Sequence, residues 1–470
     1  MAPAIARSLT LLCVALAACS HARTYYVALG GLDSDSGTVT RPFATIAGFH
    51  TVAAAGDTCL VRGGTYTPAG TIVLTKDGIE GHPICLFAYP GETPVFDGRN
   101  ATDNGLIKLS SANWWHIRGL VLTGVVTDWV SGLATIGTCT HLVLEQLVAH
   151  HCAFTGLTLG ANVSDILVLN CDAHHNVDTD YEDADGFQVT SGASGTIAAR
   201  VVFRGCRAWN NADDGWDLYF ATRGSVLIEQ CWSFRNGYDD AWNEQGNGGG
   251  FKIGGPLSDA RVSSSGGHTV LRCLAWKNKY CGFNENTNSD ATPDTLYHCT
   301  GFDNRGWRDY DFDCGLVHVL RNNLTCRTAG AATGASSATH NSWSLGLTLA
   351  DSDFLSVDDA GTDGPRGADG ALPVLDFLKP SAGSRVINRG LDIGLPYSGS
   401  APDLGAYEYM ATGTTMRGSQ VAARSAGAVG PRPFVTSGRV AVPTGAVLYG
   451  LGGESVSTRR LTSGVYVRAP

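Results

Sequence analysis

The central part of the chain repeats one pattern of apolar and polar positions five times. Each copy starts with a cysteine, followed by a small residue two positions later, an aromatic ring three positions later and an asparagine five positions later. The cysteines are Cys171, Cys206, Cys231, Cys273 and Cys299, and the asparagines are Asn176, Asn211, Asn236, Asn278 and Asn304. Beyond each asparagine, a glycine and an aromatic residue open a short run. In the first three of these runs, apolar and polar positions alternate with the period of a β-strand.

The shortest complete copies are about 25 residues long, which suits one coil of a parallel β-helix with three short strands. A single coil cannot bury its apolar face, so neighbouring coils must stack about 4.8 Å apart and pair their strands. Equivalent side chains then lie above one another. We therefore expect an all-β, single-stranded parallel β-helix in which the asparagines form a ladder of side-chain amides and the rings form a stack.

The composition agrees with strands and turns. Of the 470 residues 60 are glycine, 43% are hydrophobic and only 16% are charged, which excludes a disordered chain and a coiled coil. The formal net charge of −10 argues against a nucleic-acid partner. An acidic protein can still bind an acidic polymer where a bound metal or a basic stripe reverses the local field.

The first residues predict an export signal over residues 1–22. Arg7 precedes the apolar run Leu9–Ala18, and a cleavage site of small residues follows at Ser20-His21-Ala22. The run is too short to span a membrane, and no other segment could cross one. A secreted, monomeric protein is expected; a lipid anchor at Cys19 is the alternative.

The β-helix is predicted over residues 23–410. Residues 411–470 are rich in Gly, Ala, Ser, Thr and Arg and predict a linker and a small, strand-rich tail, similar to the sorting segments of some secreted enzymes. A disordered extension fits this tail equally well.

The repeated cysteines are expected to be buried free thiols. Export permits disulfides, but equivalent residues of stacked coils have parallel Cβ vectors, which a disulfide does not accept. Better candidates for disulfides are Cys59 with Cys85 and Cys314 with Cys326.

Two copies of the repeat contain insertions at the same corner of the coil. Four positions separate Asn211 from Gly215, whereas ten separate Asn176 from Gly186 and fourteen separate Asn236 from Gly250. The core does not need these extra residues, so they are candidates for loops that build a site.

Four carboxylates gather beside the aligned glycines of two adjacent coils, at Asp185, Asp213, Asp214 and Asp217. So many carboxylates would repel one another unless a cation lay between them. Hard oxygen ligands in this number favour Ca²⁺, because Mg²⁺ takes fewer carboxylates in stricter geometry. A solvated acidic turn is the alternative.

Two positions beyond each aligned glycine, the side chain should point to solvent. This column contains Asp217 and the residues Gln188, Lys252, Asn284 and Arg308. Lys252 is a candidate general base, since bound Ca²⁺ would oppose the carboxylates that keep it protonated; a plain ion pair with Asp217 is the alternative. Gln188, Asn284 and Arg308 are candidates for substrate contacts, and an arginine suits a carboxylate.

Three segments resemble the site motifs of family 9 polysaccharide lyases, the pectate lyases. They are Asp183-Ala184-Asp185-Gly186-Phe187, Asn211-Ala212-Asp213-Asp214-Gly215-Trp216-Asp217 and Gly250-Phe251-Lys252-Ile253-Gly254-Gly255. The opening Thr24-Tyr25-Tyr26-Val27 is similar to the capping coil of that family. The resemblance covers roughly residues 23–410. It implies a right-handed β-helix in which Asp185, Asp213, Asp214 and Asp217 hold calcium and Lys252 is the base.

The resemblance also implies a reaction, the cleavage of polygalacturonate by β-elimination. The acidic loop 238–244 departs from the family pattern and leaves the choice of uronate polymer open. Other interpretations are a lyase for another uronate polymer, a glycoside hydrolase with paired carboxylates, and a carbohydrate-binding β-helix adhesin that does no chemistry.

Overall fold

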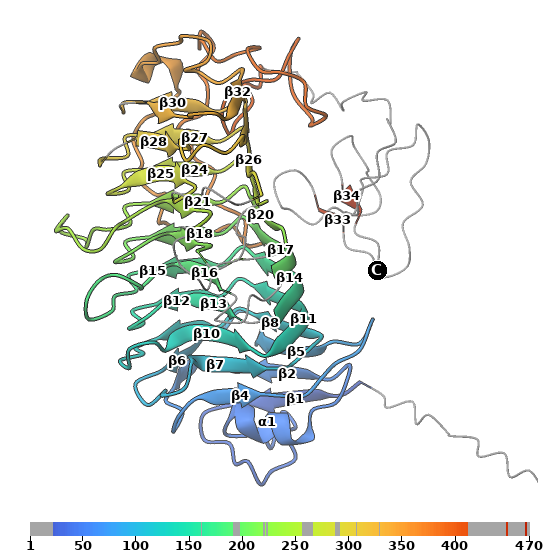
Figure 1. Ribbon diagram of the computed structural model, residues 1–470. Coiled ribbons are helices and arrows are strands. Elements are labelled where there is room, and N and C mark those ends of the chain that lie inside the picture. Colours follow the sequence, from blue (N-terminus) through green and yellow to red (C-terminus); the bar gives the residue numbers. More distant parts are fainter. Residues whose placement is uncertain are drawn as a thin grey trace, which may run out of the picture.

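The computed structural model describes residues 22–160, 162–190, 198–219, 221, 224–255, 267–286, 292–306, 308–328, 330–411, 448–449 and 466–467. The predicted export signal lies outside these residues, apart from Ala22. Within them the chain winds into stacked coils, each of which contributes a strand to each of three parallel sheets (Figure 1). The all-β parallel β-helix predicted from the repeat is therefore confirmed.

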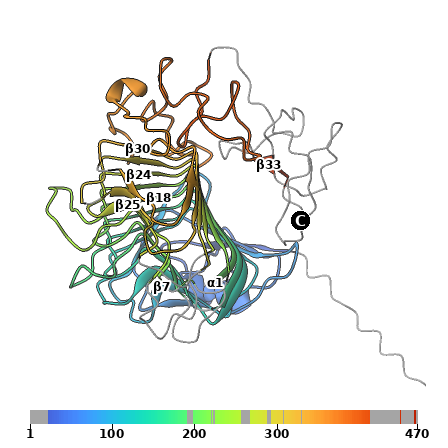
Figure 2. The ribbon, with the colours of Figure 1, turned by 45° about the horizontal axis from the view of Figure 1, so that its top comes forward.

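The first sheet has twelve strands, whose bounds follow in their order in the sheet. They are β1 (Thr24–Val27), β2 (Thr58–Val61), β5 (Ile84–Ala88), β8 (Trp115–Arg118), β11 (Thr138–Glu145), β14 (Asn162–Leu169), β17 (Ala198–Arg204), β20 (Val226–Glu229), β23 (Thr269–Leu271), β26 (Thr295–Tyr297), β29 (Val319–Arg321) and β32 (Ser337–Thr339). Figure 2 shows these strands curving together along one side of the stack.

The second sheet follows the first across a corner of each coil. Its ten strands are β3 (Gly64–Tyr66), β6 (Pro94–Asp97), β9 (Val121–Thr123), β12 (Val148–His150), β15 (Asp172–His174), β18 (Arg207–Trp209), β21 (Trp232–Phe234), β24 (Leu274–Trp276), β27 (Thr300–Phe302) and β30 (Leu324–Cys326).

The third sheet carries the candidate site. Its ten strands are β4 (Ile72–Leu74), β7 (Gly105–Ser110), β10 (Ser131–Ile136), β13 (Leu157–Gly160), β16 (Phe187–Thr190), β19 (Trp216–Asp217), β22 (Phe251–Lys252), β25 (Cys281–Asn284), β28 (Arg308–Asp311) and β31 (Ala331–Ala332). The two predicted insertions connect β15 to β16 and β21 to β22. Both project from the same side of the stack (Figure 1).

The N-terminal end of the stack is covered by helix α1 (Ile46–Val52). The hydroxyl oxygen of Thr45 caps it by accepting a 3.0 Å hydrogen bond from the N–H of Gly48. Ile46 and Phe49 are buried against the first coil. The predicted cap is thus present, and it hides strand edges that would otherwise be open to pairing.

After β32 the chain folds back along the outside of the second sheet and contains the short 3₁₀ helix η2 (Asp351–Asp353). Arg366 of this segment shares the carboxylate of Asp172 with Arg207, at 2.6 and 2.7 Å. Further on, β33 (Leu448–Tyr449) and β34 (Tyr466–Val467) form an antiparallel pair. Among the described residues, no helix has both the length and the apolar character needed to cross a membrane.

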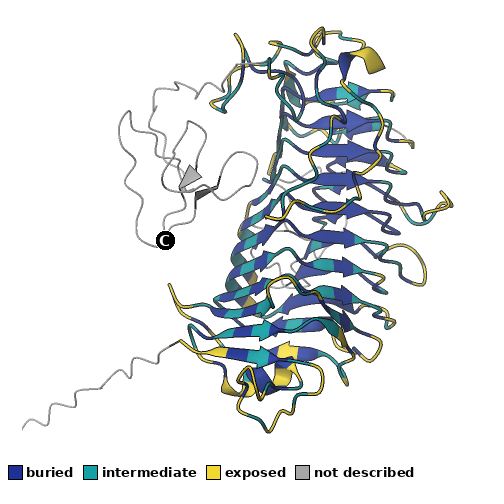
Figure 3. Ribbon diagram, turned by 180° about the vertical axis from the view of Figure 1, so that it is seen from behind, coloured by how far each residue is buried: buried dark blue, intermediate teal, exposed yellow. Residues whose placement is uncertain are grey.

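The core fills the inside of the coils, where the strands are buried almost throughout (Figure 3). The side chain of Asn176 donates to Asn211 at 2.9 Å, and each of the next three asparagines donates in the same way to its successor, at 3.0, 2.9 and 3.0 Å. On the outer face of the second sheet, the rings of His174, Trp209, Phe234 and Trp276 stack with centroid distances of 4.2, 5.6 and 4.3 Å, and the C-terminal segment covers part of this stack. Both predicted columns are confirmed.

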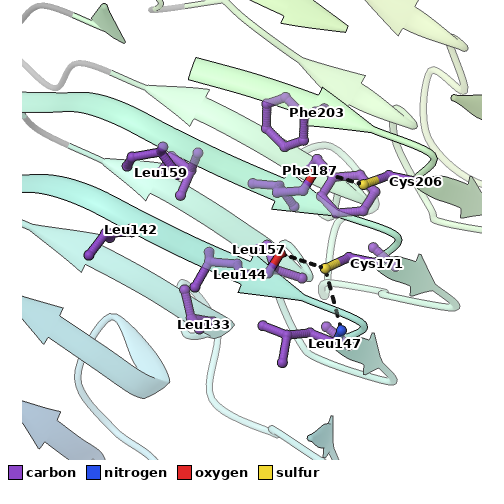
Figure 4. Close-up of a cluster of buried hydrophobic side chains, with 14 of the residues drawn as sticks. Leu133, Leu142, Leu144, Leu147, Leu157, Leu159, Cys171, Phe187, Phe203 and Cys206 are labelled. Carbon is purple, nitrogen blue, oxygen red and sulfur yellow. Dashed lines mark hydrogen bonds between the residues drawn. The ribbon is translucent and has the colours of Figure 1, made fainter. Parts of the chain in front are cut away.

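The repeated cysteines are buried free thiols, as predicted. Cys171 contacts the backbone of Leu144 and Leu147 among leucines and phenylalanines (Figure 4). The two disulfide candidates are wrong, because none of these four described cysteines forms a disulfide. Cys59 is buried on β2, whereas Cys85 is partly exposed on β5 and pairs in register with Thr58, so strand alternation turns the two thiols to opposite faces.

In the second pair, Cys326 lies on β30 opposite Phe302 of β27, in the buried cluster between the second sheet and the C-terminal segment. Cys314 lies in the connection after β28, and its sulfur is 3.4 Å from Nε2 of His318. The sequence spacing of these cysteines therefore does not correspond to a contact between them.

Candidate active site

Four residues of the predicted polar column lie in register on four successive strands of the third sheet. Gln188 of β16 pairs with Asp217 of β19, Asp217 pairs with Lys252 of β22, and Lys252 pairs with Asn284 of β25. The aromatic residue before each of them points into the core, where these rings stack 4.7 to 5.0 Å apart. The packed core therefore fixes the positions of the column residues.

Arg308 does not belong to this column, which corrects the prediction from sequence. It pairs with Cys281, and the residue opposite Asn284 is Asp311. In the sequence, Gly306-Trp307 has the same residue types as the aligned glycine and aromatic residue of the other coils. The register of the strands instead places Asp309 opposite Gly282 and Tyr310 opposite Phe283. Arg308 instead forms ion pairs with Asp311 and Asp313, at 3.1 and 3.5 Å. The contact of Arg308 with substrate stays a prediction, and its position in the sheet no longer supports it.

The four predicted aspartates converge at the start of β16 and β19, and we call them the acidic cluster. Asp185, Asp213, Asp214 and Asp217 are 0%, 1%, 2% and 7% exposed. One oxygen each of Asp185, Asp214 and Asp217 lies within 4.8 Å of the others. The carboxylate of Asp213 lies outside this triple but interacts electrostatically with Asp214 and Asp217.

Backbone N–H groups hold three of these carboxylates in place. Asp185 accepts from the N–H of Asp214 at 3.0 Å, and Asp217 accepts from that of Tyr219 at 2.7 Å. Asp214 accepts from the N–H of Gly249 at 2.6 Å. Two of these donors belong to the regular coils and the third, Gly249, to the insertion before β22, so the backbone orients the carboxylates.

The long insertion before β22 is part of the site, a role that the sequence suggested without naming its residues. Besides Gly249, the N–H of Asn247 donates to Asp213 at 2.9 Å. Lys279 fastens the insertion from the next coil by donating to the carbonyls of Gln245 and Gly246, at 2.7 and 2.8 Å. The run of three glycines that ends at Gly250 was the sequence signal for a close approach of this backbone to the site. A Cβ on Gly249 would lie 2.7 Å from Asp214 Oδ1.

Lys252 reaches into the acidic cluster from the third coil. Its Nζ is 3.1 Å from Oδ2 of Asp214 and 3.4 Å from Oδ2 of Asp217, and its side chain is 15% exposed. Burial lowers the pKa of Lys252, but the carboxylates around it outweigh burial and hold this pKa well above its ordinary value. With no cation in the cluster the lysine is a charged ion-pair partner.

The donor set of the acidic cluster fits a hard divalent cation. Burial and then mutual repulsion raise the pKa of Asp185 well above its ordinary value, so this carboxylate lacks sufficient positive charge nearby. Oδ2 of Asp214 is buried, and the positive charge beside it is the Nζ of Lys252, 3.1 Å away. One ammonium group does not neutralise four carboxylates. Ca²⁺ accepts oxygen ligands in flexible geometry and matches this set, with Asp185, Asp214 and Asp217 as the central ligands.

The chain is similar to proteins of one enzyme class. A family model described as the Pel9A-like, right-handed β-helix region matches residues 25–323. Pectate lyase L of Dickeya dadantii (strain 3937) is 33% identical over 410 residues, which cover 83% of this chain and 91% of that protein. Pectate lyase PEL9 of Emericella nidulans is 30% identical and covers 77% of this chain and 93% of that protein.

Two solved structures extend the similarity to three dimensions. The crystal structure of pectate lyase Pel9A superimposes with a TM-score of 0.73 at 32% identity, over 83% of this chain and 97% of that one. A rhamnogalacturonan lyase superimposes with a TM-score of 0.69 at 27% identity, over 77% and 97%. The coils of this chain therefore have the right-handed arrangement predicted for them.

Proposed function

Because the chain belongs to the Pel9A-like β-helix family, polysaccharide lyase family 9, and is a polysaccharide lyase, we propose that it is an exported, calcium-dependent pectate lyase with Lys252 as its base. The relatives with this name support the substrate, an acidic polygalacturonate chain. Residues 1–22 support export, with a lipid anchor at Cys19 as the alternative.

The observation that carries the proposal is the position of one amine beside several carboxylates. The Nζ of Lys252 lies within 3.4 Å of Asp214 and Asp217, on the exposed face of a sheet along which a polymer can lie. The residues that would hold Ca²⁺ are Asp185, Asp214, Asp217 and the neighbouring Asp213. The bound ion would draw charge from the C6 carboxylate of a uronate and so acidify its C5 hydrogen. It would also offset the field that keeps Lys252 protonated.

Lys252 then performs the proton transfer of a β-elimination. Its neutral amine takes the C5 proton, the C5–H electron pair becomes the C4–C5 double bond, and the C4–O bond breaks. The leaving oxygen acquires a proton from solvent. The products are one chain with a 4,5-unsaturated end and one with a new hydroxyl group, so no other reactant is needed.

Gln188 and Asn284 lie at the two ends of the same column and are proposed to contact the substrate. Asn284 is the neighbour of Lys252, and its Oδ1 is buried without a hydrogen bond from the described residues. A sugar hydroxyl group bound over β22 and β25 would supply the missing donor. Gln188 is partly exposed next to Asp217, where it can reach the same chain.

A second candidate substrate is rhamnogalacturonan, because the structure of a rhamnogalacturonan lyase aligns over 97% of its length. The experiment supplies purified protein with either polymer, with added calcium or with a chelator, and follows unsaturated uronides by ultraviolet absorbance. We expect calcium-dependent absorbance on polygalacturonate and none with Lys252→Ala. Saturated products would indicate a hydrolase. Binding without products on either polymer would indicate an adhesin and would remove the lyase proposal.

A further inference from the structure

The long insertion between β21 and β22 carries an exposed tryptophan at its tip. Trp242 is 38% exposed, and its ring centroid is 5.3 Å from that of the buried Tyr238. The tip turns sharply, because one oxygen of Asp239 accepts hydrogen bonds from the N–H groups of Ala241 and Asn243, at 2.9 and 2.8 Å. The turn therefore holds an aromatic ring in a defined position where the insertion projects from the stack (Figure 1).

The other acidic residues of this tip have partners within the chain. Oδ1 of Asp240 lies 2.8 Å from Nε2 of His175, at the corner after β15. Oε2 of Glu244 lies 3.5 Å from Nζ of Lys279, on the next coil. The carboxylates that make this loop unusual in the sequence thus attach it to the coils on both sides, and their role is to hold the loop in place.

A guanidinium group from another coil lies over the ring of Trp242. Cζ of Arg305 is 4.2 Å from the ring centroid, which is a cation–π distance. A second guanidinium group, that of Arg235, is 5.9 Å from the same centroid but is paired with Asp359 at 3.0 Å. Arg305 is exposed, and it forms no ion pair with any residue that the structure describes.

The contact with the ring leaves the hydrogen-bond donors of Arg305 available. An aromatic ring attracts a guanidinium group through its π face, so the planar fork of N–H groups can still bind a carboxylate in a bidentate way. By contrast, Arg308 on the same coil is engaged by Asp311 and Asp313. Of these two arginines, Arg305 is the one that can bind an anion without giving up an ion pair.

Arg305 lies beside the path of a polymer bound at the candidate active site. It follows Asn304 directly, and its N–H donates a 2.8 Å hydrogen bond to the carbonyl of Asn278 on the preceding coil. That preceding coil carries Asn284, and the one before it carries Lys252. Arg305 is therefore two coils, roughly 10 Å along the stack, beyond Lys252 and at the edge of the third sheet. A chain of several sugars that runs from Lys252 over Asn284 passes this edge.

We propose that Arg305, held on the ring of Trp242, is a substrate-binding residue that takes the carboxylate of a uronate farther along the polymer than the one at Lys252. The proposal rests on the proposed function, because it concerns the same polymer. The acidic cluster needs a cation to bind a uronate, whereas a guanidinium group binds the carboxylate of a more distant sugar directly. The protein should therefore bind long oligomers more tightly than short ones.

Calorimetry with oligogalacturonates of defined length tests the contact without cleavage. The full chain with Lys252→Ala, in saturating calcium, is titrated with digalacturonate and with hexagalacturonate, with and without Arg305→Ala. We expect Arg305→Ala to weaken binding of the hexamer about five- to tenfold and to leave binding of the dimer unchanged, because a dimer at the acidic cluster does not reach Arg305. Arg305→Lys should recover only part of the loss, since it lacks the planar fork. No binding of the hexamer, or equal binding with Arg305→Ala, would overturn the proposal.

Arg118→Ala is the matched control, because Cζ of Arg118 lies 4.3 Å from the ring centroid of Phe87 but on the first sheet. It should bind the hexamer normally. Trp242→Ala should reproduce part of the loss caused by Arg305→Ala, because the guanidinium group loses its support. Calcium affinity distinguishes a substrate contact from a structural role. If Arg305→Ala lowered calcium affinity as much as hexamer affinity, Arg305 would act through the insertion, and the substrate contact would be overturned.

Kinetics on polygalacturonate separate this proposal from the proposed function. Arg305→Ala alone should raise KM about fivefold and change kcat by less than about twofold, because it removes binding and not chemistry. Cleavage with an unchanged KM would overturn the contact and leave the proposed function in place. Hexamer binding that depends on Arg305, without cleavage by the wild type, would remove the proposed function and leave the contact in place.

Discussion

The backbone N–H of Gly249 donates a 2.6 Å hydrogen bond to Oδ1 of Asp214. This contact joins the longest insertion of the repeat to a carboxylate of the acidic cluster on the preceding coil. The insertion therefore orients a cation ligand through its backbone, and residues that touch neither the cation nor the substrate contribute to the site.

The first prediction concerns the closeness of this contact. In Gly249→Ala the new Cβ would lie 2.7 Å from Asp214 Oδ1, so the carboxylate or the loop must move. We expect calcium affinity to fall about 10- to 100-fold, as for other changes behind a metal ligand. Calorimetry with Ca²⁺ measures it. Gly383→Ala is the control, because a Cβ there would have no described atom within 4 Å and the variant should bind calcium normally.

The second prediction concerns Lys252 as the base. Lys252→Ala should reduce kcat by about 10²–10⁴ while the protein still binds calcium, because the carboxylate ligands remain. Since only the neutral amine accepts a proton and the ordinary pKa of a lysine is about 10.4, kcat/KM should rise with pH into the alkaline range. Steady-state rates at saturating calcium measure the profile. An acidic optimum would contradict a lysine base.

The third prediction concerns removal of the cation. A chelator should abolish activity, because four buried carboxylates then hold Lys252 as an ion-pair partner. It should also lower Tm by about 2–5 °C, since a ligand that binds only the folded state stabilises it. Differential scanning calorimetry with and without calcium measures the shift. Full activity in chelator would remove calcium from the mechanism.

The fourth prediction concerns Glu285, which is buried next to Asn284. Burial raises the pKa of Glu285 to about 7, so the folded state binds a proton that the unfolded state releases near its ordinary pKa of 4.5. The stability due to this protonated group is complete below about pH 4.5 and is lost as the pH rises through about 7. Wild type should therefore lose roughly 2–3 kcal/mol relative to Glu285→Gln between about pH 5 and 8.

Denaturant unfolding of both proteins across this pH range measures the difference. Glu80→Gln changes an exposed residue and should run parallel to wild type. A constant difference between wild type and Glu285→Gln at all pH values would refute the buried, protonated state of this carboxyl group.

The fifth prediction concerns the asparagine ladder. Asn236 accepts from the side chain of Asn211 at 3.0 Å and donates to that of Asn278 at 2.9 Å. Asn236→Ala would remove both of these bonds. It would also leave the backbone N–H of Asn211, which donates to the Asn236 side chain at 3.2 Å, buried without this acceptor, so the change should cost about 2–4 kcal/mol of unfolding free energy. A lower guanidinium midpoint would show this loss. Asn100→Ala is the control, because that residue is exposed and should change the midpoint little.

Most of the fold could be predicted from the sequence, because the repeat is periodic. Stacking transfers the spacing within one coil to the register between coils, so equivalent residues such as Asn211 and Asn236 must meet. The same reasoning places Asp217 and Lys252 on adjacent strands from their spacing alone, and the structure pairs them. Regular hydrogen bonding between strands leaves no freedom in these placements.

The tertiary structure alone decided what lies between the regular strands. Arg308 lies outside the column because the residue equivalent to the aligned glycine is Asp309, five positions after Asn304. The glycine at position 306 made an alignment based on sequence alone place Arg308 in the column. The contacts of Gly249 with Asp214 and of Thr179 with Asp128 depend on insertions whose backbone follows no period. Strand positions follow from local repetition, whereas loop conformations depend on packing against distant coils, which a single sequence does not encode in its spacing.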